Sequence, residues 1–436
     1  MSNRFFMPRA SAFDINGDPI SGGKLWFYEA GSSTPRPTFS DAGLSIENAN
    51  PVVANSAGRF GEIFLTPAVG YKVVLTDADD AVIWTADPYD SSGEEVETSL
   101  TTLRNRVING AMQLSRENGE NNVDVTENDD DTLDNWLAVL GTPAPGGTLR
   151  IAQLALATPG GSNYRMRCTA QVADATIAAG NYYTIAQRIE GYEIADAEFG
   201  SNNAKQILVR FGVRSSIAGT FGFSICNSAL NRSWVGTFAI AAGEVGTDVV
   251  RTFIIPGSTA GTWLQTTGIG LRMRICLAAG STYQGAAGWQ TGDFYTTSAQ
   301  TNFMGTGSAT FDLFDVGLYV DHPALGVLPT YEIASRIEDL LKTQRYFWAT
   351  KDAGTERDII VNGSSAAGVW YQRVPLSFPV RMRVAPTISI ATTALTNAAT
   401  AVTEEESATG VTLVVTSSGA GDFAATYTSV VADARL

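Results

Sequence analysis

Gly22-Gly23-Lys24-Leu25-Trp26-Phe27-Tyr28-Glu29-Ala30-Gly31 opens the segment that decides the fold of the first domain. Residues 24–28 form a short apolar and aromatic run enclosed by glycines, which predicts a strand that begins and ends at turns. Further strand-like runs, separated by polar or acidic turns, lie at residues 52–54, 61–65, 71–76 and 81–84. We therefore expect a small β domain at residues 1–92.

The order of these pieces resembles the N-terminal virion-attachment domain of bacteriophage tail fibres and tailspikes. The resemblance covers about the first fifth of the chain and rests on residues 23–28, 34–35, 50–53, 57–59, 63–65, 71–75 and 83–84. It implies docking on a phage particle, with Phe5, Phe6, Trp26 and Tyr28 as candidate docking residues. The alternative is a generic small β domain.

The composition describes a folded, acidic protein. The chain has 436 residues, enough for about three domains, with 44% hydrophobic and 17% charged residues. A net charge of −15 argues against a nucleic-acid partner, because binding phosphates requires clustered Lys and Arg. No apolar run is long enough to span a membrane. The first eight residues lack the features of a secretory signal, so we expect synthesis in a cytoplasm, which the phage resemblance implies is that of the bacterial host.

Cysteine and histidine usage gives little support for a metal centre. Cys168, Cys226 and Cys276 are widely spaced, and each lies in an apolar strand-like run, which predicts buried free thiols. His322 is the single histidine. The acidic run at residues 124–134 has the hard oxygen ligands that Ca²⁺ prefers, but it lacks the spacing of an EF-hand. A solvated acidic loop is the preferred interpretation, and we expect no cofactor.

No catalytic set is evident from the sequence. A lone histidine argues against Ser-His-Asp and Cys-His nucleophile systems, and no phosphate loop, dinucleotide fingerprint or zinc-protease motif is present. Paired carboxylates can hydrolyse glycosides, as in many tailspikes. Those tailspikes generally carry a long parallel β-helix, and this sequence lacks a repeat of that kind. We therefore expect no enzymatic activity, with a glycan depolymerase as the remaining alternative.

A polar connector at residues 93–106 leads into the second domain. Val96, Leu100, Leu103 and Val107 recur at spacings of four, three and four, which matches the apolar seam of a short coiled coil. An ordinary amphipathic linker helix fits the same pattern. Because fibre and spike proteins of the resembled kind are usually homotrimers, the resemblance implies a trimeric neck.

Residues 107–322 predict a two-sheet sandwich or jelly roll. Short runs of alternating apolar and polar residues are divided by glycine turns at regular spacing. They lie at residues 149–154, 164–168, 182–189, 206–213, 220–225, 249–255, 270–277 and 309–316. The segment resembles the jelly-roll module of phage tail proteins, which is similar to carbohydrate-binding modules. The matching pieces are residues 107–111, 134–136, 187–191, 213–221, 261–263 and 311–319.

Sugars are commonly held by aromatic rings that stack on their apolar faces. Four aromatic residues in expected loops of the sandwich are therefore candidate carbohydrate contacts: Trp263, Tyr283, Trp289 and Tyr295. For each, the alternative is a packed structural ring. Trp136 and Trp234 have apolar neighbours and are interpreted as core residues.

A connecting helix is predicted within residues 323–350, followed by a β domain at residues 351–436. Thr330 is the candidate N-cap, and Ile333, Ile337, Leu340 and Leu341 form one apolar face that we expect to pack on both neighbouring domains. The last predicted strand, residues 423–432, is long and would need covering by a neighbouring chain if it lay at a sheet edge.

The sequence as a whole favours a phage virion fibre or spike. Its N-terminal domain would dock on tail or head structural proteins, and its later β domains would adsorb to polysaccharide on the host cell surface. The alternative is a purely structural head fibre or decoration protein. Either would be found at the virion surface, as a homotrimer with no nucleic-acid partner and no membrane insertion.

Overall fold

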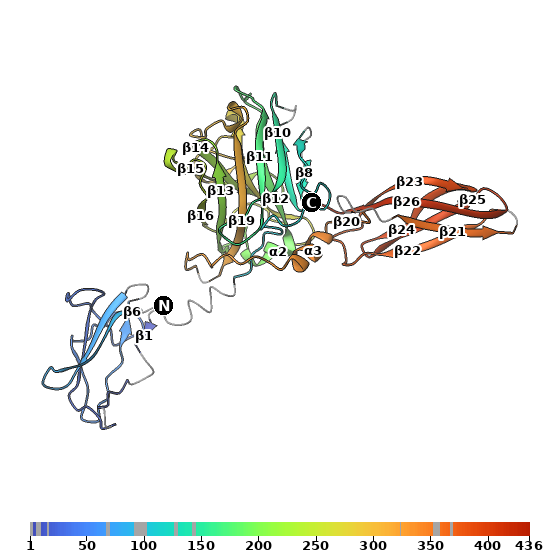
Figure 1. Cartoon of the computed structure of the whole chain (residues 1–436). Coiled ribbons are helices and arrows are strands. Elements are labelled where there is room, and N and C mark those ends of the chain that lie inside the picture. Colours follow the sequence, from blue (N-terminus) through green and yellow to red (C-terminus); the bar gives the residue numbers. More distant parts are fainter. Residues whose placement is uncertain are drawn as a thin grey trace. The chain divides into compact units, whose positions relative to one another are not determined.

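The computed structural model describes residues 3–5, 10–14, 17–66, 70–90, 103–125, 130–141, 145–322, 324–351, 358–366 and 369–436. The protein is mainly β and divides into two compact units, Met1–Thr102 and Leu103–Leu436 (Figure 1). The predicted fold class is confirmed. No helix in the described ranges is long and apolar enough to cross a membrane.

The first unit is a small β domain. A four-stranded sheet has the order β3 (Val52–Val53), β2 (Lys24–Glu29), β5 (Gly70–Thr76) and β6 (Val82–Asp90), and β1 (Asn3–Arg4) pairs with β4 (Phe64–Leu65). Leu25, Phe27, Tyr71, Val73 and Leu75 alternate along β2 and β5 and point to one core. This period of two is why the run at residues 24–28 forms a half-buried strand.

Two antiparallel sheets form the sandwich of the second unit. The six-stranded sheet has the order β16 (Val249–Ile255), β13 (Gln206–Ser215), β19 (Thr310–Asp321), β11 (Tyr164–Val172), β10 (Thr148–Ala155) and β7 (Val123–Val125). The seven-stranded sheet has the order β18 (Gly288–Thr291), β15 (Arg232–Ile240), β14 (Gly219–Cys226), β17 (Ile269–Ala279), β12 (Tyr182–Glu190), β9 (Trp136–Leu140) and β8 (Asp130–Leu133).

Aromatic side chains from both sheets fill the sandwich core. Phe211 stacks on Phe223 with ring centroids 5.6 Å apart, and Phe221 lies 5.1 Å from Phe311. Trp136 is fully buried, and its indole N–H donates to the carbonyl of Asn109. The three cysteines are also buried and free. Short helical turns join the strands: α2 (Gly191–Ile194), η1 (Ala195–Ala197), η2 (Ala242–Glu244), η3 (Ser281–Tyr283) and η4 (Phe303–Gly305).

The C-terminal domain is a smaller sandwich. In one sheet, β26 (Gly421–Asp433) pairs with β20 (Phe347–Ala349) and β21 (Ile359–Ser365) along one side and β23 (Thr387–Thr396) along the other. The other sheet has the order β22 (Tyr371–Ser377), β25 (Gly410–Ser417) and β24 (Ala398–Ser407). Because β26 is paired on both sides within its own chain, it needs no neighbouring chain to cover it.

The connecting helix differs from the prediction. Helix α3 spans Arg336–Gln344 with Ser335 at its N-cap, so Thr330 does not cap it. The preceding segment is non-helical, and it buries Tyr331 under the guanidinium of Arg210.

The buried face of α3 also differs from the predicted apolar face. Ile337 and Leu341 are exposed, whereas Asp339 and Thr343 are buried. The polar face turns inward because Thr343 accepts a hydrogen bond from Arg116 and Asp339 accepts one from the backbone of Asn109.

The predicted neck lies partly outside the described residues, which exclude Val96 and Leu100. Leu103 and Val107 lie in a non-helical segment, and Val107 packs in the sandwich core. Arg106 and Asn105 fix this segment by hydrogen bonds to Leu318 and Val316 of β19. Val107 is therefore not available for a seam between chains.

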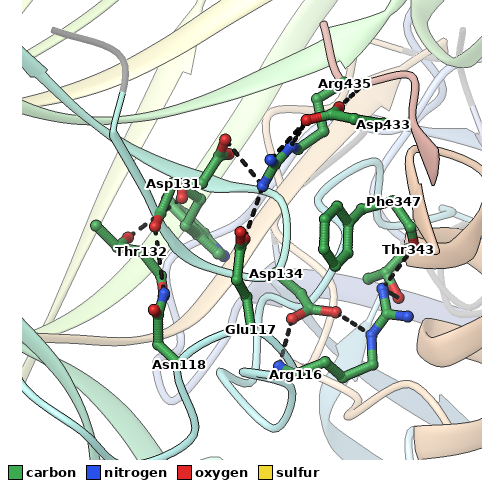
Figure 2. Close-up of polar contacts among 11 residues, drawn as sticks. Arg116, Glu117, Asn118, Asp131, Thr132, Asp134, Thr343, Phe347, Asp433 and Arg435 are labelled. Atoms are coloured by element: carbon green, nitrogen blue, oxygen red, sulfur yellow. Dashed lines mark hydrogen bonds and ion pairs between the residues drawn. The ribbon is translucent and has the colours of Figure 1, made fainter. Parts of the chain in front are cut away.

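Polar contacts join the sandwich to the C-terminal domain (Figure 2). The guanidinium of Arg435 contacts the carboxylates of Glu117, Asp131 and Asp433 at 2.6–2.9 Å. It also lies over the ring of Phe347, at 4.6 Å from the centroid. We call this set, with Arg116, Asp134, Arg345, Tyr346 and Glu190, the junction.

Candidate functional site

Two of the four predicted sugar-contact residues are buried in the sandwich. Trp263 packs edge-on against Phe199, with centroids 4.9 Å apart, and is 8% exposed. Tyr295 is 2% exposed, lies under the guanidinium of Arg274, and donates its hydroxyl to Asp293. Burial raises the pKa of the Tyr295 hydroxyl. Because neither ring presents a face to solvent, these two residues are not part of the proposed site.

Trp289 is half-buried and already surrounded. Arg232 covers its ring at 5.2 Å, and Phe199 and Trp263 approach it edge-on at 5.9 Å. Its indole N–H donates to the carbonyl of Pro256. Arg232 thus takes up one face of the ring, and Trp289 stays a candidate contact.

Tyr283 packs beside two other tyrosine rings. It is half-buried, stacks one face on Tyr295 at 4.8 Å, and meets Tyr182 edge-on at 4.6 Å. Tyr283 therefore stays a candidate contact, outside the groove described next.

A shallow groove crosses the outer face of the six-stranded sheet. Its volume is about 270 Å³, close to the lower end of the roughly 300–1,000 Å³ typical of small-molecule sites. Strand β7 is short and pairs with residues 149–151 of β10. Among the described residues, no strand pairs with residues 152–155 on this side of β10. The lining residues are Glu120, Asn122, Arg150, Ala152, Gln153, Leu154, Ala155, Arg167 and Thr169.

Two arginine–carboxylate pairs border the groove. Arg150 binds Asp124 through Nε and Nη2 at 2.5 and 2.8 Å, and Arg167 binds Asp312 in the same side-on manner at 2.7 and 2.8 Å. The strand register places each arginine directly opposite its partner. Side-on pairing leaves Nη1 of both arginines without a hydrogen bond among the described residues.

Hydrogen bonding favours the charged forms of Asp124 and Arg167. Hydrogen bonding to Arg150 lowers the pKa of Asp124, and hydrogen bonding to Asp312 raises the pKa of Arg167. Bidentate pairs of this kind hold their donors and acceptors in a fixed plane. Fixed polar groups beside the small apolar floor of Ala152 and Leu154 suit a ligand that has hydroxyl groups and an apolar ring face.

The hollows at the junction are too small for such a ligand. They measure about 10 and 20 Å³, roughly the space of a single water. The ion pairs of the junction therefore contribute to the packing of the sandwich against the C-terminal domain.

Three carboxylates of the acidic run at residues 124–134 are engaged by arginines. Asp124 binds Arg150, Asp131 binds Arg435, and Asp134 binds Arg116. Across the part of the chain that the structure describes, no three His, Cys, Asp or Glu side chains are grouped to hold a metal ion.

The groove was not predicted from the sequence, because the predicted sugar contacts were all aromatic residues. Alternation along β10 and β11 does place Arg150, Ala152, Arg167 and Thr169 on one face, and this signal was present in the sequence. The sequence did not show that β10 pairs with β11 and β7.

The candidate docking residues of the first unit lie in different environments. Phe5 is buried against Phe27, with centroids 5.2 Å apart, and Phe6 is outside the described residues. Trp26 and Tyr28 are half-buried on the opposite face of β2 and lie parallel, with centroids 6.4 Å apart.

Neither a protein family nor a curated protein matches the sequence. Solved structures give weak similarities. One is the enzymatically active domain of tailspike protein 4 of bacteriophage CBA120, at 10% identity and a TM-score of 0.26, covering 50% of this chain and 21% of that one.

A second similarity is to a family 11 carbohydrate-binding module from Clostridium thermocellum, in complex with a mixed-linked tetrasaccharide. It has 12% identity and a TM-score of 0.25, and covers 48% of this chain and 97% of that one. A xylanase module pair from the same organism, complexed with xylohexaose, has 10% identity and a TM-score of 0.25, and covers 48% of this chain and 29% of that one. At these values the similarities do not assign the chain to a family.

Proposed function

We propose that this protein is a glycan-binding fibre or spike of a phage virion, and that the groove on the six-stranded sheet binds the glycan. The observation that carries the proposal is the groove itself. Its two bidentate pairs leave Nη1 of Arg150 and Arg167 available to sugar hydroxyls, while Ala152 and Leu154 offer an apolar floor.

The first unit is proposed to dock on the particle. Trp26 and Tyr28 lie on the outer face of its sheet. Strand β6 exposes Val82, Ile83 and Trp84, and Trp84 lies opposite the core residue Leu75, on the other face. Apolar surface that a small domain leaves open supports an interaction with another protein. We propose homotrimeric assembly, display at the virion surface and synthesis in the host cytoplasm.

Glycan binding is tested with the full chain on an array of bacterial polysaccharides. Arg150→Ala removes one groove donor at an exposed position. We expect at least a tenfold loss in affinity, which corresponds to about 1.4 kcal/mol. Arg251→Ala is the matched control, because Arg251 is paired to Glu244 at similar exposure on the same sheet but outside the groove.

Other outcomes would favour other functions. Absence of binding to any glycan would favour a purely structural head fibre or decoration protein. Release of reducing sugar from a polysaccharide would favour a depolymerase. Imaging particles with an antibody to residues 1–90 tests the virion location and distinguishes head from tail.

A further inference from the structure

Three pairs of strand ends lie at the end of the C-terminal domain opposite the junction. Strand register places Ser365 opposite Gly421, Tyr371 opposite Thr416, and Ala398 opposite Ser417. The other end of β26, at Asp433, pairs with Phe347 beside the junction. Because β26 has 13 residues, the two ends lie roughly 40 Å apart at about 3.3 Å per residue. We call residues 364–366, 369–371, 395–398 and 417–422 the tip.

The tip exposes large apolar side chains. Trp370 is 55% exposed, Tyr371 and Val369 are each 62% exposed, and Leu395 is 47% exposed. Single exposed apolar residues are common on protein surfaces, but several at one end of a domain, with two aromatic rings among them, indicate a binding surface.

The backbone beneath these rings is fixed. The N–H of Trp370 donates to Oγ of Ser417 at 2.9 Å, and the N–H of Ser417 donates to the carbonyl of Trp370 at 2.9 Å. Ser417 is fully buried. Asn397 ties two turns together by donating to the carbonyls of Ala420 and Asp422. Exposed rings on a fixed backbone lose little entropy on binding a ligand.

The tip carries a single charged residue, the exposed Asp422 at its border. Residues 363–372, 391–403 and 410–421 contain no Asp, Glu, Lys or Arg, although 17% of the chain is charged. Apart from Asp422, the polar side chains of the tip are hydroxyls and an amide: Ser364, Ser365, Thr396, Asn397, Ser417 and Ser418. A surface without basic residues does not suit nucleic acid or anionic lipid.

We propose that the tip is a second carbohydrate-binding surface, which takes neutral sugars through Trp370 and Tyr371. Their rings stack on the apolar faces of the sugar, and the hydroxyl and amide groups around them bind its hydroxyls. The inference rests on the proposed function in taking a glycan as the ligand. It adds a site about 40 Å beyond the junction, with a preference for uncharged residues of the polysaccharide.

The test uses the full chain on an array that contains neutral and anionic bacterial polysaccharides. Trp370→Ala and Tyr371→Ala should each weaken binding to neutral glycans at least tenfold. Tyr192→Ala is the matched control, because Tyr192 is 58% exposed on α2, away from both the tip and the groove. Unchanged thermal unfolding of all three variants shows that the fold is intact.

Unchanged neutral-glycan binding by both tip variants would overturn the inference. If Arg150→Ala then still lost affinity, the proposed function would stand without the tip. Two further measurements address other occupants, namely sedimentation velocity and co-sedimentation with vesicles of phosphatidylethanolamine and phosphatidylglycerol. Either of two results for Trp370→Ala, with unchanged glycan affinity, would overturn the proposal. A smaller assembly would assign the tip to a contact with a second copy of the chain. Lost vesicle binding would assign it to a membrane.

Discussion

Nη1 of Arg435 lies 2.9 Å from Oδ2 of Asp131, and this ion pair joins the end of the last strand to the sandwich. The same guanidinium binds Glu117 and Asp433. One cation thus contacts three carboxyl groups, whose side chains are 23% to 44% exposed. Burial raises the pKa of the Asp131 carboxyl to about 7, with Arg435 opposing that shift and the neighbouring acids adding to it.

Replacing Arg435 by Met should destabilise the second unit, because three carboxylates lose their cation. Breaking a fully buried pair costs about 3–5 kcal/mol, and partial exposure here reduces our expectation to about 2 kcal/mol. Denaturant unfolding of the full chain measures the loss. Arg150→Met, at an exposed pair, should leave the free energy of unfolding nearly unchanged. Equal effects of the two substitutions would contradict the role assigned to the junction.

Asp131 should make stability depend on pH between about 4 and 7. In the folded state this carboxyl holds its proton up to about pH 7, whereas in the unfolded chain it ionises near its model value of 3.8. The folded state therefore binds the extra proton across this range, and the contribution of Asp131 to stability falls as pH rises through it.

Asp131→Asn imitates the protonated carboxyl and should remove this slope. Relative to the original protein, the variant should gain stability at pH 8. The gain is at most about 4 kcal/mol at 1.36 kcal/mol per pKa unit, and less because the side chain is 23% exposed. Unfolding free energies measured from pH 5 to 9 give the difference. Parallel pH profiles for the two proteins would rule out the raised pKa.

Tyr346→Phe should weaken the junction from its other side. The Tyr346 hydroxyl donates to Oε2 of Glu190 at 2.8 Å, and Glu190 is fully buried and also paired with Arg345. Losing a donor to a buried carboxylate costs about 1–3 kcal/mol. Tyr192→Phe, at an exposed ring, should leave the unfolding midpoint unchanged. A midpoint unaffected by Tyr346→Phe would show that Arg345 alone satisfies Glu190.

The three thiols should be unreactive in the folded protein. Burial raises the pKa of Cys226 to about 11 and that of Cys276 to about 12, and it raises the pKa of Cys168 well above its usual value. The thiolate is the reactive form, so labelling by a thiol reagent at pH 8 should require unfolding. Rapid labelling without denaturant would contradict this, and guanidinium chloride should expose all three.

The strands of the sandwich were predictable where alternation is regular. In β10, buried Leu149, Ile151 and Gln153 alternate with outer Arg150 and Ala152, and the predicted range agrees closely with the strand. Strand β15 was missed because Gly236 interrupts its apolar pattern and Trp234 suggested only a core position. Strand β24 was missed because its polar run of Thr and Glu has little apolar signal.

Contacts between distant segments were beyond prediction from pattern alone. The helix at Arg336–Gln344 has an apolar stripe, yet it turns Asp339 and Thr343 inward, because partners on a remote segment satisfy them. In the same way, Trp263 and Tyr295 are of residue types that commonly bind sugars, but Phe199 packs against Trp263 and Arg274 covers Tyr295. Whether an aromatic side chain faces solvent depends on which loops pack together, and the sequence pattern does not show which loops do.

Strand β26 runs without a break from the tip to the junction and is hydrogen-bonded along both sides. A pull applied at Trp370 and resisted at the sandwich would load these ladders in shear, so that many bonds bear the force at once rather than opening one after another. The architecture thus favours mechanical resistance along the long axis of the C-terminal domain, a property suited to a tether under tension.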